Sequence, residues 1–389
     1  QKTQKNYNEK QTHNDMKKTL LLIAAALFFA GCGAKHQVEL IPAENFNTEV
    51  DGKPVSLYTL HGGDITMQVT NFGARVVSLW TPDKNGSFED VVLGYNNIED
   101  YVHNQGERFL GAVVGPYANR IAGGTFTVGD QVYNFPLNNN GQTLHGGLKG
   151  VDMLVWDVCE VTDSSIVLNL VHPDGLDGFP GNIDIRLSYL LDSENNFVLN
   201  YRATTDKATY FNISHHPFFN LKGEGNGTIL DNEMIINASA YIPIDEYSIP
   251  YGEIAPVEGT PFDFRKTHTI GERIGEKNEQ LANGAGYDHN FCIDRKTESG
   301  VEFDASVYEP KSGRFLEVFS DQPGLQFYSG NFFDGTTCGK YGKPLRYRES
   351  IALETQHWPD SPHHPNFPST LLEPGQTYTQ TCIYRFSVK

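Results

Sequence analysis

The clearest structural signal in the chain is the stretch Ile183-Asp-Ile-Arg-Leu-Ser-Tyr-Leu190, followed closely by Phe197-Val-Leu-Asn-Tyr-Arg202. Apolar and polar side chains alternate in both, which is the period of a strand with one buried face. The same alternation appears in Asp64-Ile-Thr-Met-Gln-Val-Thr70 and Ser165-Ile-Val-Leu-Asn-Leu-Val171. In Phe126-Thr-Val-Gly-Asp-Gln-Val-Tyr133, a Gly-Asp pair separates two groups of strand formers and predicts a β-hairpin.

Strands of this kind recur about every ten residues along the chain, with turn signals between them. Helical periodicity covers only single turns, near residues 98–102 and 269–277. The 38 Gly and 20 Pro among 389 residues favour many turns over long helices. No change in composition marks an internal linker, and no segment repeats at a fixed period. We therefore predict an all-β fold, a single large antiparallel β-sandwich with few short helices.

The composition argues against some classes of function. Hydrophobic residues make up 39% of the chain, which is enough for a large core and too many for a disordered protein. Acidic residues outnumber basic ones by 48 to 30, and the net charge is −18. Because this field repels polyphosphates, we expect no nucleic-acid partner. A neutral substrate is compatible with it.

The N-terminus has the pattern of an export signal. Residues 1–15 are a polar extension, and Met16-Lys17-Lys18 then precedes an apolar run over residues 20–30. This run is too short to span a bilayer and ends in Ala30-Gly31-Cys32, which resembles a bacterial lipobox. We expect residues 1–31 to be removed and Cys32 to be lipidated, leaving residues 32–389 as one domain of an exported protein held to the membrane by lipid alone. The alternatives are an ordinary signal peptide or a buried strand.

Four further cysteines, Cys159, Cys292, Cys338 and Cys382, are widely separated, and no CxxC motif occurs. They predict neither a zinc site nor a redox pair. An exported protein can form disulfides, but the spacing does not assign a pairing. We therefore expect buried free thiols.

Two long polar loops, residues 103–124 and 136–150, are rich in Gly, Asn and His. Such loops on a rigid sheet often form binding sites. No phosphate-binding glycine loop, GxSxG elbow or HExxH zinc motif occurs, and the calcium-like run at Asp83 has the wrong spacing. The segments that could carry chemistry are residues 115–120, 144–147, 212–221, 286–291 and 352–360.

Two of these segments contain side chains suited to proton transfer. His215 and His216 are neighbours on a predicted strand, so their side chains point to opposite faces and one of them is expected to be structural. Glu354 follows three apolar residues at the end of another predicted strand, where a carboxylate is costly unless it has partners.

Together these segments resemble the aldose 1-epimerases (galactose mutarotases), in order and spacing, across about residues 40–388. The similarity is close at six motifs: Asn119-Arg-Ile121, Leu144-His-Gly-Gly147, His216-Pro-Phe-Phe-Asn-Leu221, Tyr287-Asp-His-Asn-Phe291, Gly324-Leu-Gln-Phe-Tyr-Ser-Gly-Asn-Phe332, and Leu353-Glu-Thr-Gln-His-Trp-Pro-Asp-Ser-Pro362 with Asn366-Phe-Pro-Ser369. The resemblance implies a supersandwich with an open monosaccharide cleft on one sheet.

The resemblance also implies roles for individual residues. The general acid falls on His216 and the general base on Glu354. The residues implied to orient or contact the sugar are Arg120, His145, Asp288, Asn119 and Gln326. One position departs from the family pattern, because Pro217 stands where Ser or Thr is common. Since proline cannot donate to a sheet, we expect the strand to bend or end there.

The chemistry of anomer exchange asks for the same residue types. One group must take a proton from the C1 hydroxyl while another gives a proton to the ring oxygen. A carboxylate and an imidazole on opposite sides of the ring would do so near neutral pH. This mechanism requires no cofactor and no metal, although the many carboxylates leave a structural calcium ion open. Phe218, Tyr287, Tyr328 and Trp358 are candidates for stacking on the sugar or for core packing.

Three other functions remain open from the residues alone. A sugar-binding lipoprotein would use the cleft without needing both proton-transfer groups. A glycoside hydrolase would use two carboxylates such as Asp288 and Glu354, which leaves His216 without a role. A sugar-phosphate epimerase would need a basic pocket, whereas the segments offer one evident Arg. We expect a monomeric enzyme whose partner is a free monosaccharide.

Overall fold

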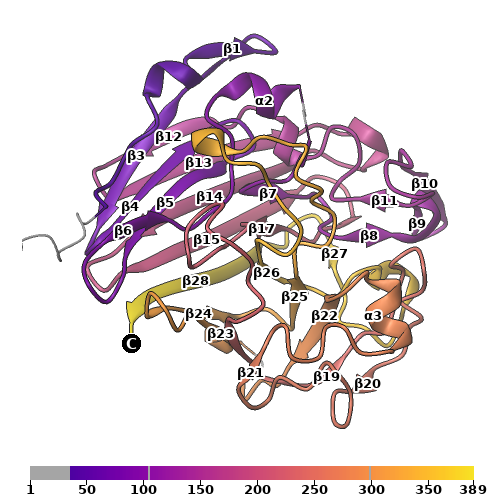
Figure 1. The fold of residues 1–389 in the computed structure, drawn as a ribbon. Coiled ribbons are helices and arrows are strands. Elements are labelled where there is room, and N and C mark those ends of the chain that lie inside the picture. Colours follow the sequence, from indigo (N-terminus) through magenta and orange to yellow (C-terminus); the bar gives the residue numbers. More distant parts are fainter. Residues whose placement is uncertain (1–35, 104–105, 298) are drawn as a thin grey trace, which may run out of the picture. The chain divides into compact units, whose positions relative to one another are not determined.

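Antiparallel sheets dominate the part of the chain that the computed structural model describes, residues 36–103, 106–297 and 299–389 (Figure 1). Residues 37–389 form one compact unit. The predicted lipidation site, Cys32, and the rest of the N-terminal signal lie outside the described residues.

The largest sheet has nine strands and contains the stretches with the clearest alternation. Residues 165–171, 183–190 and 197–202 lie in three neighbouring strands, β13, β14 and β15. In spatial order the strands are β12 (Asp157–Val161), β13 (Ser165–His172), β14 (Ile183–Leu191), β15 (Asn196–Thr205), β28 (Tyr378–Val388), β24 (Arg314–Ser320), β23 (Glu302–Tyr308), β18 (Glu233–Ile236) and β21 (His268–Thr269).

The facing layer is built from two smaller sheets and several strand pairs. The four-stranded sheet is β3 (Leu57–Gly62), β4 (Ile65–Thr70), β5 (Arg75–Pro82) and β6 (Phe88–Asp90). The five-stranded sheet is β20 (Ala255–Pro256), β19 (Ala238–Tyr241), β22 (Asp288–Ile293), β25 (Gly324–Tyr328) and β26 (Ala352–Gln356). The pairs are β1 (Thr48–Val50) with β2 (Lys53–Val55), β7 (Ala112–Val114) with β17 (Ser214–His216), β8 (Arg120–Ile121) with β11 (Thr143–Leu144), β9 (Thr125–Val128) with β10 (Gln131–Asn134), and β16 (Thr209–Tyr210) with β27 (Leu371–Leu372).

The main core lies between these layers. Leu187 and Leu199 of the nine-stranded sheet belong to one buried cluster with Met67 of the four-stranded sheet and Phe327 and Leu353 of the five-stranded sheet. This packing of sheet on sheet confirms the predicted β-sandwich. It also leaves the opposite face of β22, β25 and β26 to the long loops, and that face carries the site described below.

The predicted hairpin and one of the two predicted helical turns are confirmed. The strands β9 and β10 pair around Gly129 and Asp130. Helix α2 (Ile98–Val102) begins after Asn97, whose side chain accepts the Asp100 backbone N–H, as an N-cap does.

The segment predicted as a helical turn, 269–277, forms hydrogen-bonded turns, such as that from the Glu272 N–H to the Thr269 carbonyl, but no helix. Its first N–H groups, at Ile270 and Gly271, bond to the carbonyls of Asn232 and Leu230, so they continue the sheet edge formed by β21. The next helix, α3 (Glu279–Asn283), begins later, after Asn278. Short 3₁₀ turns lie at Ala43–Phe46, Ala122–Gly124, Val151–Met153, Leu176–Gly178, Lys340–Gly342 and Ser361–His363.

The prediction of buried free thiols is half wrong. Cys159, Cys292, Cys338 and Cys382 are free, but only Cys292 and Cys382 are buried. Cys159 lies on the edge strand β12, and Cys338 lies in a loop; both are exposed.

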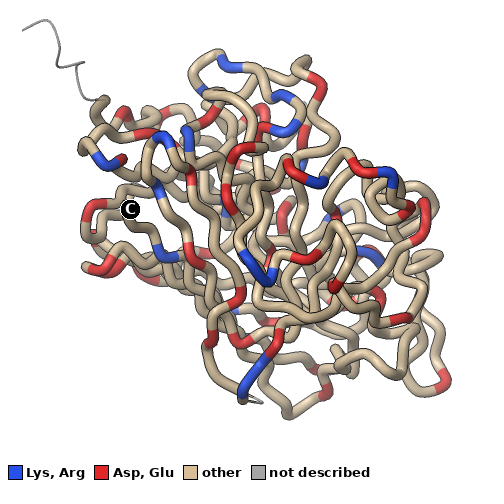
Figure 2. The backbone as a smooth tube through the Cα atoms, turned by 60° about the horizontal axis from the view of Figure 1, so that its bottom comes forward, with Lys and Arg blue, Asp and Glu red and all other residues tan. Residues whose placement is uncertain are grey.

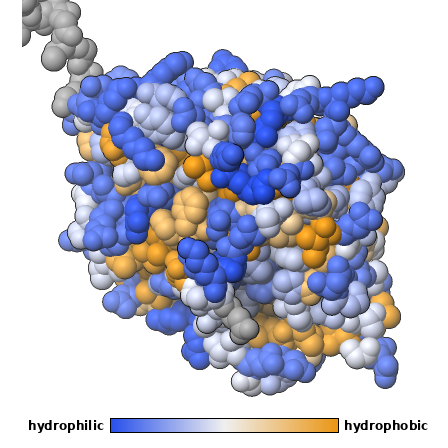
Figure 3. Space-filling model, turned by 90° about the horizontal axis from the view of Figure 1, so that it is seen from below, coloured by the Kyte–Doolittle hydropathy of each residue, from blue (hydrophilic) through white to orange (hydrophobic). Residues whose placement is uncertain are grey.

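The surface is mixed in both charge and hydropathy. Lysine and arginine residues are scattered among the acidic ones along the chain (Figure 2). Seen from below, apolar side chains form separate patches between hydrophilic ones (Figure 3). Among the described residues, no helix has both the length and the apolar character needed to cross a bilayer.

A buried charge cluster joins the end of strand β6 to two loops. The Lys340 ammonium contacts the carboxylates of Asp90 at 2.7 Å and Glu224 at 3.3 Å, and all three side chains are almost completely buried. Burial raises the pKa of Glu224 to about 8, and the negative charge of the nearby Asp90 carboxylate adds to this shift. Lys340 opposes it. Glu224 therefore keeps its proton at neutral pH.

This cluster predicts a loss of stability at alkaline pH. A carboxyl group whose pKa is raised on folding stabilises the protein fully below its unfolded pKa, and that contribution falls as the pH rises toward the folded pKa. We expect the free energy of unfolding to fall by about 2–3 kcal/mol between pH 6 and 8 through Glu224. Glu224→Gln should flatten this slope in thermal or urea unfolding, whereas Glu160→Gln, at an exposed position, should not. Equal slopes in all three proteins would contradict the assignment.

Candidate active site

Three polar side chains form a row across the outer face of the five-stranded sheet. Asn290 of β22 pairs in register with Gln326 of β25, which pairs with Glu354 of β26. Asp288 lies two residues before Asn290 and so points to the same face. Its carboxylate Oδ1 accepts a hydrogen bond from Gln326 Nε2 at 2.7 Å. The neighbouring residues Phe327 and Leu353 point into the core, which fixes the orientation of the row.

His216 lies against the end of this row. Its Nε2 is 3.4 Å from Glu354 Oε1, and its ring stacks on Phe218 with the centroids 4.7 Å apart. Strand β17 ends at His216, as expected from Pro217. His215 points the other way, into the core beside Tyr189, where its Nε2 lies 3.2 Å from the Gly111 carbonyl. The two histidines thus lie on opposite faces, as predicted. His216, which the resemblance implies to be the general acid, is the one in the site.

The long loops close the site from the other side. The His145 ring lies edge-on to His216, with the centroids 5.3 Å apart. Strands β8 and β11 bring the 115–120 and 144–147 segments together by pairing Arg120 with Leu144. Arg120 and Asn119 line one cavity with Asp288 and Gln326. All seven residues implied to act on the sugar therefore surround one site.

Burial sets the protonation of the two carboxyl groups. It raises the pKa of Glu354 well above its usual value, and the nearby Asp288 carboxylate adds to this shift while Arg120 opposes it. Burial also raises the pKa of Asp288, against Arg120 and the Gln326 hydrogen bond. Arg120 thus supplies the positive charge that both carboxylates need in order to ionise.

The same burial keeps His216 neutral in the unliganded site, because it lowers the pKa of this ring to about 3. Glu354 and His216 therefore form an uncharged pair with a proton on Glu354. Moving that proton to His216 yields a carboxylate and an imidazolium with the same total number of protons. The two atoms that would exchange this proton, His216 Nε2 and Glu354 Oε1, are 3.4 Å apart.

The two groups lie side by side, which differs from the expected placement on opposite sides of the sugar ring. Both oxygens that exchange protons, the C1 hydroxyl and the ring oxygen, are bonded to the same carbon. Adjacent acid and base groups can therefore reach both oxygens.

His145, His216 and Glu354 offer ligand atoms within 4.8 Å of one another, the spacing of a metal site. The hydrogen bonding of His145 argues against a metal. The Asn119 backbone N–H donates to His145 Nδ1 at 3.1 Å, so this nitrogen carries no hydrogen and Nε2 carries it instead. A metal-binding imidazole needs a free lone pair, and it usually donates its other N–H to an acceptor. His145 meets neither requirement, and its Nε2–H is a hydrogen-bond donor.

We expect ¹⁵N NMR to find His145 as the neutral Nε2–H tautomer from pH 5 to 8. Burial and the neighbouring His216 and Arg120 lower its pKa well below the usual value. His363, whose pKa is raised by its hydrogen bond to Asp360, is the internal control and should titrate at a higher pH. An Nδ1–H tautomer, or protonation of His145 near pH 6.5, would contradict the assignment.

Asp360 holds the Arg120 strand in place from the C-terminal motif. Its backbone N–H donates to the Arg120 carbonyl at 3.1 Å, and its carboxylate accepts the Ala122 N–H at 2.9 Å. This pairing explains why Asp360, 240 positions away in the sequence, accompanies the Asn119-Arg120 motif.

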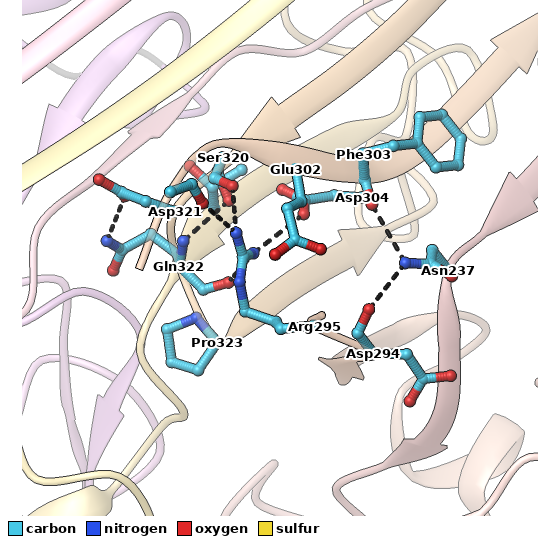
Figure 4. A network of polar contacts seen from close by, with 12 residues as sticks. Asn237, Asp294, Arg295, Glu302, Phe303, Asp304, Ser320, Asp321, Gln322 and Pro323 are labelled. Carbon is cyan, nitrogen blue, oxygen red and sulfur yellow. Dashed lines mark hydrogen bonds and ion pairs between the residues drawn. The ribbon is translucent and has the colours of Figure 1, made fainter. Parts of the chain in front are cut away.

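A second network holds the turn that leads into β25. The Arg295 guanidinium donates to the carbonyls of Ser320 at 2.5 Å and Gln322 at 2.7 Å and pairs with Asp304 (Figure 4). Trp358, just after β26, donates its Nε1–H to the Pro323 carbonyl at 3.0 Å. Both strands that carry Gln326 and Glu354 are thus fixed where they meet this turn.

Several features of the site do not follow from the sequence pattern. Phe109 packs on His145, with the ring centroids 4.6 Å apart. The sequence predicts that its loop, residues 103–124, forms a binding site, but nothing in the sequence singles out Phe109. Asn290 belongs to the Tyr287–Phe291 motif, but only the strand register shows that it faces the site. Tyr287, a candidate for sugar stacking, is buried in the core against Phe327.

The comparisons agree with this geometry. The aldose 1-epimerase family model matches residues 56–385. The galactose mutarotase of Rattus norvegicus is 41% identical over 337 residues, covering 87% of this chain and 95% of the relative. The aldose 1-epimerase of Escherichia coli K12 is 34% identical over 339 residues, covering 86% and 96%.

Two solved structures are similar in fold. The aldose epimerase homologue of C. elegans has a TM-score of 0.79 and 27% identity, covering 86% of this chain and 99% of its own. The galactose 1-epimerase of Lactobacillus acidophilus has a TM-score of 0.76 and 30% identity, covering 88% and 97%. From its matched length, its sandwich and the residues gathered in its site, the chain belongs to the aldose 1-epimerase family of isomerases.

Proposed function

We propose that the protein interconverts the α and β anomers of a free aldose of the galactose or glucose type, with Glu354 as general base and His216 as general acid. The observation that carries this proposal is the contact between His216 Nε2 and Glu354 Oε1 at the end of a row of sugar-binding side chains. A binding protein would need no buried acid–base pair.

The reaction begins with the carboxylate–imidazolium form of the pair. Glu354 takes the proton of the C1 hydroxyl while His216 gives a proton to the ring oxygen, so the C1–O5 bond breaks and the free aldehyde forms. Rotation about C1–C2 turns the other face of the carbonyl toward O5. Reclosure returns the proton from O5 to His216 and the proton of Glu354 to O1, which restores the starting pair.

The remaining residues hold the sugar so that only C1 turns. His145 donates through Nε2–H, Arg120 donates through its guanidinium, and Asp288 accepts. Fixing the hydroxyls that do not react lowers the entropic part of the barrier.

Polarimetry of freshly dissolved α-anomers tests this proposal. Purified protein should speed the approach of galactose or glucose to anomeric equilibrium in proportion to its concentration, in the presence of EDTA. Absence of acceleration with galactose, glucose, xylose and arabinose would refute it. Release of nitrophenol from nitrophenyl glycosides would instead support the hydrolase alternative.

We further propose that the protein is exported, lipidated at Cys32, and monomeric. The support for export is the basic start, the short apolar run and Ala30-Gly31-Cys32. Intact mass of membrane-extracted protein should show that residues 1–31 are missing and acyl mass is added, and Cys32→Ser should release the protein from membranes. An uncleaved N-terminus would contradict this location, and a sedimentation coefficient of a dimer would contradict the monomer.

A further inference from the structure

We propose that Asn290 is a specificity-determining residue of the site, which accepts a hydrogen bond from a hydroxyl on C3 or C4 of the bound aldopyranose. This inference rests on the proposed function and adds a sugar contact that the sequence motifs do not assign. It depends on the hydrogen bonding of Asn290, on the cavity that it lines and on its distance from Glu354.

Two buried amide oxygens of the row lack hydrogen-bond partners among the described residues. Asn290 is 2% exposed, its Oδ1 has no hydrogen-bond partner among the described residues, and its Nδ2 reaches only the Phe291 carbonyl, at 3.4 Å. Gln326 Oε1 is also without a partner in the described part of the chain, since Gln326 uses its Nε2 on Asp288. Buried acceptors without a hydrogen bond destabilise the empty site. A hydroxyl donor from substrate would satisfy them.

The residues that carry these oxygens line a small cavity. Asn290 and Gln326 line a cavity of about 10 Å³, close to the room taken by a single water molecule. Arg120 and Asp288 line the same cavity, and the rest of its lining is largely apolar, formed by Ile242, Ile244, Ser248, Pro250 and Pro359. Apolar walls with a few converging polar groups are typical of small-ligand sites.

The wall formed by residues 242–250 is held in place by hydrogen bonds. Gln280 accepts the Ile244 N–H at 2.7 Å and donates to the Ile244 carbonyl at 3.0 Å. His289, on the strand that carries Asn290, lies 3.2 Å from the same Gln280 oxygen. The sheet and the wall are thus linked through one side chain, and the cavity between them is preorganised.

The sheet geometry relates this cavity to the reacting carbon. Strand β25 lies between the strands of Asn290 and Glu354, so these residues are two strand spacings apart, roughly 9–10 Å between backbones. With the C1 hydroxyl at Glu354, the hydroxyls that reach toward Asn290 are those across the ring, on C3 and C4. Gly324 leaves room for this side chain, because a Cβ there would lie 2.5 Å from Asn290 Oδ1.

The test compares Asn290→Leu with wild type on galactose, glucose and their 2-, 3-, 4- and 6-deoxy forms. We expect Asn290→Leu to lower kcat/KM roughly 10- to 100-fold on the parent hexoses, mainly through KM. On either the 3-deoxy or the 4-deoxy sugar, whichever lacks the hydroxyl that donates to Asn290, the kcat/KM of Asn290→Leu should lie within about threefold of that of wild type. Asn232→Leu is the matched control, since Asn232 is also buried with both amide atoms unpartnered but does not line this cavity. It should affect all sugars alike.

Equal losses on every sugar, or losses that follow the thermal midpoint, would overturn the inference and make Asn290 structural. Selective loss on the 2-deoxy or 6-deoxy sugar would overturn the placement across from C1. The same contact can be tested without turnover by measuring the sugar affinity of the Glu354→Gln variant and of the double variant that also carries Asn290→Leu. A wild-type protein that binds sugars without epimerising them would refute the proposed function and leave this binding test valid.

Discussion

His216→Asn should lower kcat/KM for anomer exchange by about 10²–10⁴-fold, the usual contribution of a general acid or base. The reason is that the ring can open only if its oxygen gains a proton, and in the proposed mechanism His216 gives that proton while its neighbour Glu354 acts as the base. Asparagine fills part of the same space and can donate a hydrogen bond, but it cannot release a proton. The uncatalysed rate at each pH must be subtracted in the polarimetric assay.

His215→Asn is the matched control, because it makes the same substitution one residue away on the opposite face. His215 lies among Tyr189, Phe197 and Tyr384 of the core, so its replacement should lower the thermal midpoint and leave turnover of the folded fraction nearly unchanged. Equal losses of turnover in the two variants at equal stability would contradict the assignment of the acid.

The strands that have one buried face and one solvent-facing face were predictable from the sequence. Strands β14 and β15 alternate apolar and polar residues because one face lies in the core and the other meets solvent. Strands β22, β25 and β26 are buried on both faces, so their residues show no such period. Only the resemblance of their motifs indicated that these strands carry the site.

The relations within the site were not predictable from spacing. His145 and Asn119 are 26 positions apart, and the tautomer of His145 depends on where one backbone N–H points. The row of Asn290, Gln326 and Glu354 depends on strand register, which no local pattern defines. For the same reason the 269–277 segment looked helical, since its pairing partners lie some 40 residues earlier.

Glu354→Gln should lower turnover by roughly 10²-fold or more, because anomer exchange cannot start until the C1 hydroxyl loses its proton. Glutamine keeps the shape and hydrogen-bonding reach of Glu354 but accepts no proton. Sugar binding should be largely retained, since Arg120, His145 and Asp288 remain. Glu224→Gln is the control, because it removes an equally buried carboxyl group outside the site and should leave turnover unchanged.

The stability of the same variant gives a second, independent readout. Burial raises the pKa of Glu354, so the folded state holds the proton more tightly than the unfolded state does. A carboxyl of this kind contributes stability that is full below its unfolded pKa and falls as the pH rises toward the folded pKa. Glutamine does not ionise, so the variant does not lose this stability as the pH rises. Glu354→Gln should therefore have an equal or higher thermal midpoint at pH 8 while it loses activity. Turnover within a few-fold of wild type would mean that another group is the base, and outright loss of sugar binding would mean that Glu354 chiefly holds the substrate.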